Sequence, residues 1–193
     1  MNIPMITALQ SAITEALASI PTAEAEQIYA LSFYINNEYD DPRLPTLTVG
    51  YNTVDEWHTS IPKASSSDEA KWNYAFWLQN ELLIFGDSDS QTADILARWV
   101  ADLGLGLGYS DAEEDVDFER CLELGQEITE QFVAAVCVVA STLHSNLTVS
   151  RVFGRSVPII VHELEYYNEI ADQTEACNPP RLAEEFVSWV RSI

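Results

Sequence analysis

The residues best suited to chemistry in this chain lie in one apolar stretch, VPIIVHELEYYNE, from Val157 to Glu169. Its His162 and Glu163 match the first half of a zinc-peptidase signature, in which a second histidine four residues after the first completes the metal site on one helix. Position 166 is a tyrosine, so the signature is broken. The apolar run also favours a strand, where neighbouring side chains point to opposite faces. We therefore expect a hydrogen-bonded structural histidine and no metal site.

The other catalytic candidates have less support from spacing. His58 and His144 show no spacing that would join them to His162 at a common ion. The cysteines are Cys121, Cys137 and Cys177. Their odd number and wide spacing match neither a disulfide framework nor a zinc ribbon. Cys177, in the loop-like TEACNPP, would need a base supplied by the fold to act as a nucleophile. We predict no cofactor, and a hydrolase centred on His162 or Cys177 is the alternative hypothesis.

An acidic segment at 111–130 is more distinctive, because it holds nine acidic residues and one basic residue. On a helix, Glu119, Glu123, Glu127 and Glu130 form a stripe at 100° per residue. The opposite, apolar side consists of Phe118, Cys121, Leu122, Gly125, Ile128 and Phe132. Like charges four residues apart each cost about 0.2 to 0.5 kcal/mol. Such a stripe either keeps the protein soluble or meets a positive partner.

Aromatic residues gather in the first half of the chain, where eleven of twenty lie between Tyr29 and Phe85. Stacking on nucleic-acid bases would require interleaved lysines and arginines, which are scarce there. Core packing is the main use that we expect, and a partly exposed tryptophan is also a common interface anchor. The predicted partner-binding residues are therefore Asp115, Glu119, Glu123, Glu127, Glu130 and Trp57.

The overall charge limits the class of partner. The 193 residues include 31 acidic and 9 basic side chains, a net charge of −22. Such a surface repels phosphate backbones, which argues against nucleic acid and anionic membranes. It attracts basic proteins, although a salt-adapted or merely soluble surface is the alternative explanation. The chain has no long apolar span and no signal-peptide pattern at its start, so we predict a cytoplasmic protein without a membrane segment.

The elements that must position these residues follow from periodicity and turn signals. Helical spacing is expected at 6–20, 88–104, 111–144 and 178–193, and strands at 27–36, 46–51, 147–154 and 157–164. The first two strands are expected to form an antiparallel hairpin. This order predicts a single α+β domain over residues 1–193, with a small, largely antiparallel sheet packed against several helices.

Several segments occur in an order that resembles a known family. They are YALSFY, YNTVDEW, the Trp72 and Trp77 pair, FGRSVPIIVHELEYYNEI and NPPRLAEEFVSWV. In this order the chain resembles the bacterial domain-of-unknown-function family 4303 over nearly its whole length. The resemblance implies a small cytoplasmic bacterial domain with no assigned catalytic residues, similar to proteins found beside toxin genes. We therefore expect a non-enzymatic, immunity-like binding protein with a basic protein partner.

Overall fold

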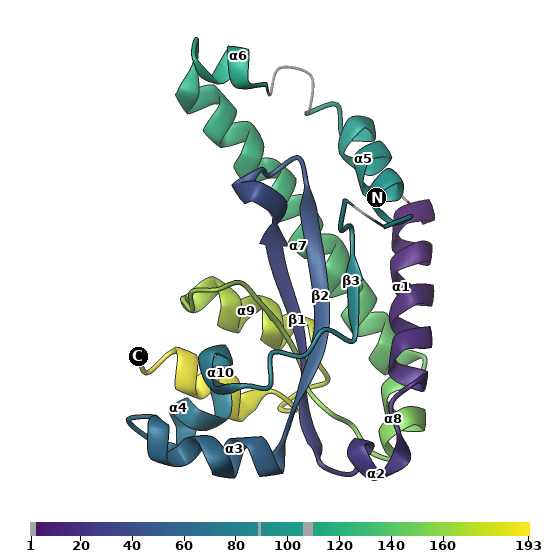
Figure 1. The fold of residues 1–193 in the computed structure, drawn as a ribbon, viewed down its shortest axis with the longest axis vertical. Coiled ribbons are helices and arrows are strands. Elements are labelled where there is room, and N and C mark those ends of the chain that lie inside the picture. The colour runs from purple at the N-terminus through teal and green to yellow at the C-terminus, as the bar shows by residue number, and fades with distance from the viewer. Residues whose placement is uncertain (1–2, 89, 106–109) are drawn as a thin grey trace.

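The computed structural model describes residues 3–88, 90–105 and 110–193 (Figure 1). Its α-helices are α1 (Ile3–Ala18), α2 (Thr22–Ala25), α3 (Val54–Ser60), α4 (Ser67–Trp72), α5 (Ala93–Asp102), α6 (Asp111–Glu114), α7 (Phe118–Ser145), α8 (Thr148–Phe153), α9 (Asn168–Cys177) and α10 (Glu184–Val190). Its strands are β1 (Ile28–Asn37), β2 (Pro45–Thr53), β3 (Leu83–Phe85) and β4 (Ile159–His162), and its 3-10 helices are η1 (Glu38–Asp40), η2 (Ile61–Lys63) and η3 (Tyr74–Phe76).

One four-stranded sheet, in the order β3-β2-β1-β4, organises the fold. β1 and β2 form the predicted antiparallel hairpin, and β3 extends it antiparallel to β2. β4 pairs with β1 in parallel, so Phe33 is the partner of both Val49 and Val161. The α+β class and the largely antiparallel sheet are confirmed, with one parallel pairing at the β4 edge.

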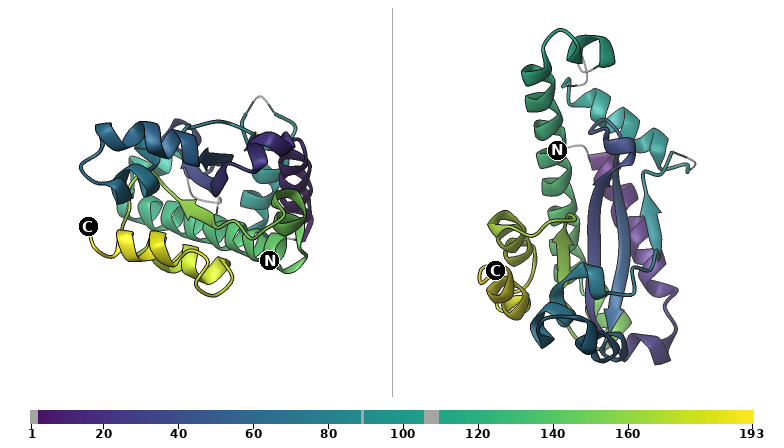
Figure 2. Two further views of the ribbon diagram at one scale, coloured as in Figure 1. Left: turned by 90° about the horizontal axis from the view of Figure 1, so that it is seen from below. Right: turned by 60° about the vertical axis from the view of Figure 1, so that its left-hand side comes forward.

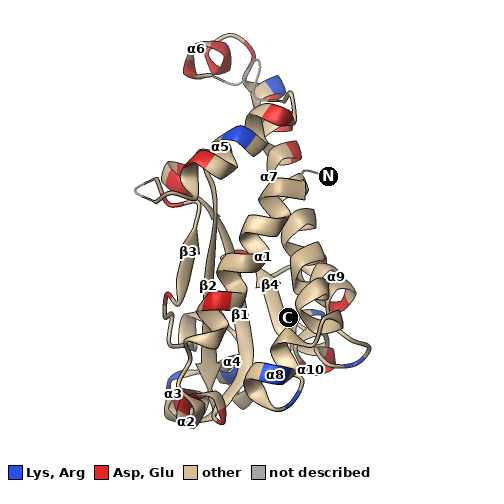
Figure 3. Cartoon of the chain, turned by 90° about the vertical axis from the view of Figure 1, so that its right-hand side faces the viewer, with Lys and Arg blue, Asp and Glu red and all other residues tan. Residues whose placement is uncertain are grey.

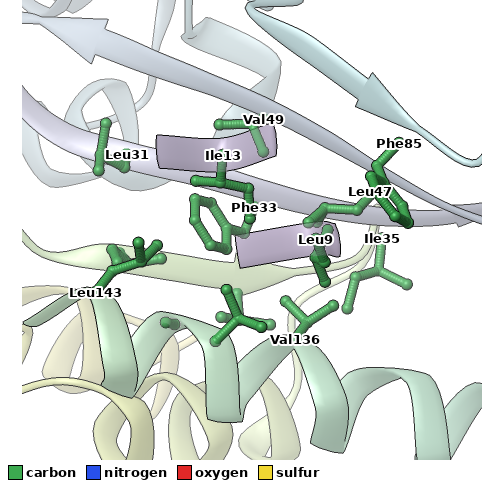
Figure 4. Close-up of a cluster of buried hydrophobic side chains, with 14 of the residues drawn as sticks. Leu9, Ile13, Leu31, Phe33, Ile35, Leu47, Val49, Phe85, Val136 and Leu143 are labelled. Atoms are coloured by element: carbon green, nitrogen blue, oxygen red, sulfur yellow. The ribbon is translucent and has the colours of Figure 1, made fainter. Parts of the chain in front are cut away.

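Helices cover both faces of this sheet (Figure 2). On one face, Leu31, Phe33 and Ile35 of β1 pack against α1 and α7 in the main hydrophobic core (Figure 4). Helix α1 reaches this core with Met5, Leu9, Ile13 and Leu17, which recur every four residues and are all buried. Since both faces of β1 are covered, its sequence is a nearly continuous apolar run.

The second face carries a separate aromatic core. Trp72 of α4, Trp77 after η3 and Phe186 of α10 pack there beside Ala30 and Ile160. Helix α9 packs beside β4 and contacts both α7 and α10. This face is where the sheet holds His162.

Helix α7 is 28 residues long and runs without a break. Of the helices in the described part of the chain, α7 alone is long and apolar enough to cross a membrane, judged by length and composition. Its C-terminal half buries Phe132, Val136, Val139 and Leu143 in the main core, and core helices meet the same criterion. The structure is therefore compatible with a soluble protein.

Two local predictions were wrong. Residues 147–154, predicted as a strand, contain helix α8, because Val149 and Phe153 are buried at helical spacing and the Asn146 side chain accepts hydrogen bonds from the Thr148 backbone and hydroxyl. Cys177, expected in a loop, is the last residue of helix α9.

Candidate functional site

His162 lies at the end of β4 with both ring nitrogens hydrogen-bonded. Its Nδ1 is 2.9 Å from the carbonyl oxygen of Glu163, and its Nε2 is 2.8 Å from the Ser32 hydroxyl on β1. Because a carbonyl only accepts, Nδ1 carries the proton and Nε2 accepts from Ser32. The pair resembles a serine nucleophile with its base. However, Ser32 is 2% exposed and His162 is fully buried, so a substrate has no access to either group.

Aromatic rings close the space around this histidine. The rings of Tyr34, Tyr74, Trp77 and Tyr166 have centroids 4.8 to 6.3 Å from the imidazole. The burial disfavours the imidazolium and lowers the pKa of His162 to about 4. We name these five residues the His162 cluster. Its geometry matches the expected structural histidine, held neutral and fully hydrogen-bonded.

The other nominated catalytic residues are not brought to this cluster. His144 on α7 bonds the Asn178 side chain at 3.1 Å, and His58 on α3 contacts the ring of Trp57. Cys177 is 2% exposed, and the neighbouring Cys137 thiol and burial both raise its pKa. Within the described ranges, no group of three or more His, Cys, Asp or Glu residues is arranged to hold a metal ion.

The predicted acidic residues lie directly after α6 and along α7, whose first turns extend beyond the turn between β1 and β2 (Figure 1). We name residues 111–126 the acidic tip; its Asp and Glu positions are red on the ribbon at the top of Figure 3. Ser110 caps α6 as predicted, since its hydroxyl accepts a hydrogen bond from the Glu113 backbone. Asp117 caps α7 by accepting from the Arg120 backbone. Some tip carboxylates therefore stabilise the helix starts.

Three of the predicted binding residues lie exposed in this tip. Asp115 follows the last turn of α6, and Glu119 and Glu123 lie one turn apart on α7. Asp111 is 3.4 Å from Arg43, whose guanidinium is closer to Asp41 at 2.6 Å. In the described part of the chain, no further ion pair involves a carboxylate of the tip. The negative charge of this surface is therefore largely unneutralised.

The tip also exposes large apolar side chains, which the sequence pattern did not foresee. Val116 is 86% exposed, Phe118 58% and Leu122 62%. The pattern placed Phe118 and Leu122 on the buried side of the helix, together with Cys121. Only Cys121 of these three is buried, because this part of α7 extends beyond the strands that would cover the others. Apolar side chains among charges are typical of an interaction surface.

The remaining predicted residues lie elsewhere. Glu127 accepts a hydrogen bond from Gln131, and Glu130 accepts one from Gln126. Trp57 is on α3, at the opposite end of the molecule from α6 (Figure 1). Its ring is covered by the Lys71 ammonium, 4.9 Å from the ring centroid. The structure therefore does not bring Trp57 together with the acidic stripe.

A groove runs along α7 beside α9 and the segment that precedes it. It consists of two adjoining cavities of about 390 and 780 Å³. Both cavities are lined by Asn37, Thr129, Glu163 and Tyr167. The larger one also includes Glu130, Glu169 and Cys137. Glu119 and Glu123 of the acidic stripe thus lie in the exposed tip, and Glu130 lines this concave, acidic groove.

Comparison with known proteins adds no further information about this site. No family model, no curated protein and no solved structure matches the chain.

Proposed function

We propose that this protein is a non-enzymatic binding domain that engages a basic protein partner at the acidic tip. The observation that supports the proposal is the combination of unneutralised carboxylates and exposed apolar side chains on one projecting helix. Phe118 and Leu122 lie one turn apart on α7, and so do Glu119 and Glu123. An apolar centre with a charged surround is the usual composition of a protein interface.

Charge complementarity determines the kind of partner. The carboxylates of the tip favour a surface rich in lysine and arginine, which would also bind faster at low salt. The apolar side chains add contact area that depends little on salt. A partner should therefore combine basic residues with an apolar patch. We extend the proposal to an immunity-like function, inhibition of a basic toxin, which the expected resemblance to family 4303 implies.

The test uses parallel columns of immobilised protein, each challenged with lysate of the native organism and eluted with a salt gradient. One column carries the wild type, and a second carries Glu119→Lys with Glu123→Lys. A third carries Glu26→Lys with Glu81→Lys, a control with the same charge change at exposed positions outside the tip. We expect a basic protein on the first and third columns only. Its Kd for the tip variant should be at least about tenfold weaker, or about 1.4 kcal/mol.

A fourth protein, Phe118→Ser with Leu122→Ser, tests the apolar part of the surface. It should also weaken binding, with little change in the salt dependence. If the tip variant and the control variant lost the partner equally, net charge alone would explain the binding. That result would contradict the proposal. So would a wild-type column that retains no basic protein.

A further inference from the structure

Two cysteines face each other where α7 packs against α9. The Cys137 sulfur is 3.9 Å from the carbonyl oxygen of Gln173, one turn before Cys177 on α9. On the next turn of α7, the Ser141 hydroxyl donates to the carbonyl oxygen of Cys177 at 3.2 Å. The Cys177 thiol donates to the carbonyl oxygen of Thr174, the residue after Gln173, at 3.5 Å. Two cysteines 40 positions apart in the sequence thus direct their sulfur atoms to adjacent carbonyl groups in one turn of α9.

The two sulfur atoms differ in their access to solvent. Cys137 is partly exposed and lines the larger cavity of the groove, whereas Cys177 is 2% exposed. The closeness of the two thiols lowers the pKa of Cys137 and raises that of Cys177, which burial raises further. Since the thiolate is the reactive form, Cys137 is the nucleophile of the pair and Cys177 keeps its proton.

The groove selects which reagents reach Cys137. The cavity that Cys137 lines also contains the carboxylates of Glu130, Glu163 and Glu169. Their negative potential disfavours anionic reagents and admits neutral or cationic ones. A small neutral oxidant fits this opening. Cys121 offers a contrast within the same chain, because burial and the nearby carboxylates of α6 raise its pKa.

We propose that Cys137 and Cys177 form a dithiol site that hydroperoxides oxidise through the groove, with Cys137 as the attacked and Cys177 as the resolving residue. The Cys137 thiolate attacks a peroxide oxygen and breaks the O–O bond, which gives a sulfenic acid and releases hydroxide or alkoxide. The Cys177 sulfur then attacks the Cys137 sulfur. The S–O bond breaks, and the thiol proton leaves with the sulfenic oxygen as water. The product is a disulfide between α7 and α9, and the peroxide is reduced by two electrons.

The first experiment compares the three cysteines in the unmodified, folded chain. Iodoacetamide alkylation is followed by peptide mapping over time, and Cys137 should react at least about tenfold faster than Cys121 or Cys177, because each unit of pKa changes the thiolate fraction about tenfold. A cationic methanethiosulfonate should label Cys137 faster than an anionic one. That preference should shrink in Glu130→Gln with Glu169→Gln and at high salt.

The second experiment exposes the reduced protein to hydrogen peroxide. Mass spectrometry should find a disulfide-linked peptide pair containing Cys137 and Cys177, and dithiothreitol should reverse the link. In Cys177→Ala, dimedone should trap a sulfenic acid at Cys137, and in Cys137→Ser, Cys177 should stay reduced. Peroxide that carries Cys137 to sulfinic acid in the wild type without this disulfide would overturn the proposal. Slower alkylation of Cys137 than of Cys121 would overturn it independently of any variant.

Discussion

The His162 cluster and the acidic tip both gather side chains capable of chemistry, but they differ in what those side chains contact. The two ring nitrogens of His162 are bonded, to Ser32 and to the Glu163 carbonyl, and four aromatic rings enclose the imidazole. In the tip, Glu119 and Glu123 are exposed and lie beside uncovered apolar residues. A buried polar group with all its hydrogen bonds made stabilises the fold. A charged group without an ion-pair partner at the surface is available to bind another protein.

The sharpest test of this contrast is the same substitution in both regions. Phe186 is fully buried against Trp72 and the Tyr166 ring of the cluster, and Phe118 is 58% exposed in the tip. Phe186→Ala should lower the free energy of unfolding by about 3 to 5 kcal/mol, because it removes buried surface and leaves a cavity. Phe118→Ala should change it by less than about 0.5 kcal/mol. Urea denaturation followed by tryptophan fluorescence measures both. Similar losses would show that the tip is part of the core.

Acid should weaken the His162 cluster. The folded pKa of His162 is about 4, below its ordinary value of 6.5, so between these values the unfolded chain binds a proton that the folded chain does not. The stability from neutral His162 is present above about pH 6.5 and is lost as the pH falls towards about 4. The loss should reach roughly 3 kcal/mol. The Tyr34, Tyr74 and Tyr166 rings pack around the imidazole, and their hydroxyls have raised pKa values and stay protonated throughout.

The control for this pH effect is His162→Gln, which keeps a hydrogen-bonding side chain but does not titrate. His144, whose pKa burial also lowers, is present in both proteins, so its contribution cancels in the difference. The decrease in the free energy of unfolding between about pH 7 and about pH 4.5 should therefore be smaller in the variant than in the wild type. An equal fall in both proteins would assign the acid sensitivity to other groups.

The smallest expected effect concerns the repulsion within the stripe. Glu123 has Glu119 and Glu127 one turn away on either side. Glu123→Gln should raise the free energy of unfolding by about 0.2 to 0.5 kcal/mol at low salt, and the gain should vanish at high salt. Glu119→Gln is the matched control, because its charge also interacts favourably with the start of the helix. It should stabilise the protein less than Glu123→Gln.

Local patterns account for much of the fold but for little of the site. The strands at β1, β2 and β4 and the helix at α1 follow from apolar periodicity, which depends on near neighbours. The same reasoning failed at 147–154, where the β-branched residues favour a strand but the packing of Val149 and Phe153 in the core favours a helix. Residue types also identified His162 and the acidic stripe, but not their surroundings.

The surroundings of a residue depend on where the helices and strands that pack against its own element end and meet. The apolar pattern of α7 is continuous from the exposed Phe118 to the buried Phe132, so only the end of the sheet separates the two. The pairing of Cys137 with Cys177 depends on how α7 packs against α9, which no local spacing encodes. Trp57 was grouped with the acidic residues by composition, and the fold places it at the opposite end.

The parallel pairing of β4 with β1 has a consequence for synthesis on the ribosome. Leu31 pairs with Ile159, so more than 120 further residues must emerge after β1 before the sheet gains its fourth strand. Until then the nascent chain presents the uncovered edge of β1, with its backbone groups available to other strands. Such late, long-range closure slows folding and exposes the intermediate to aggregation. We expect the nascent chain to need protection by chaperones up to the release of residue 162, the point at which Ser32 can first meet its histidine.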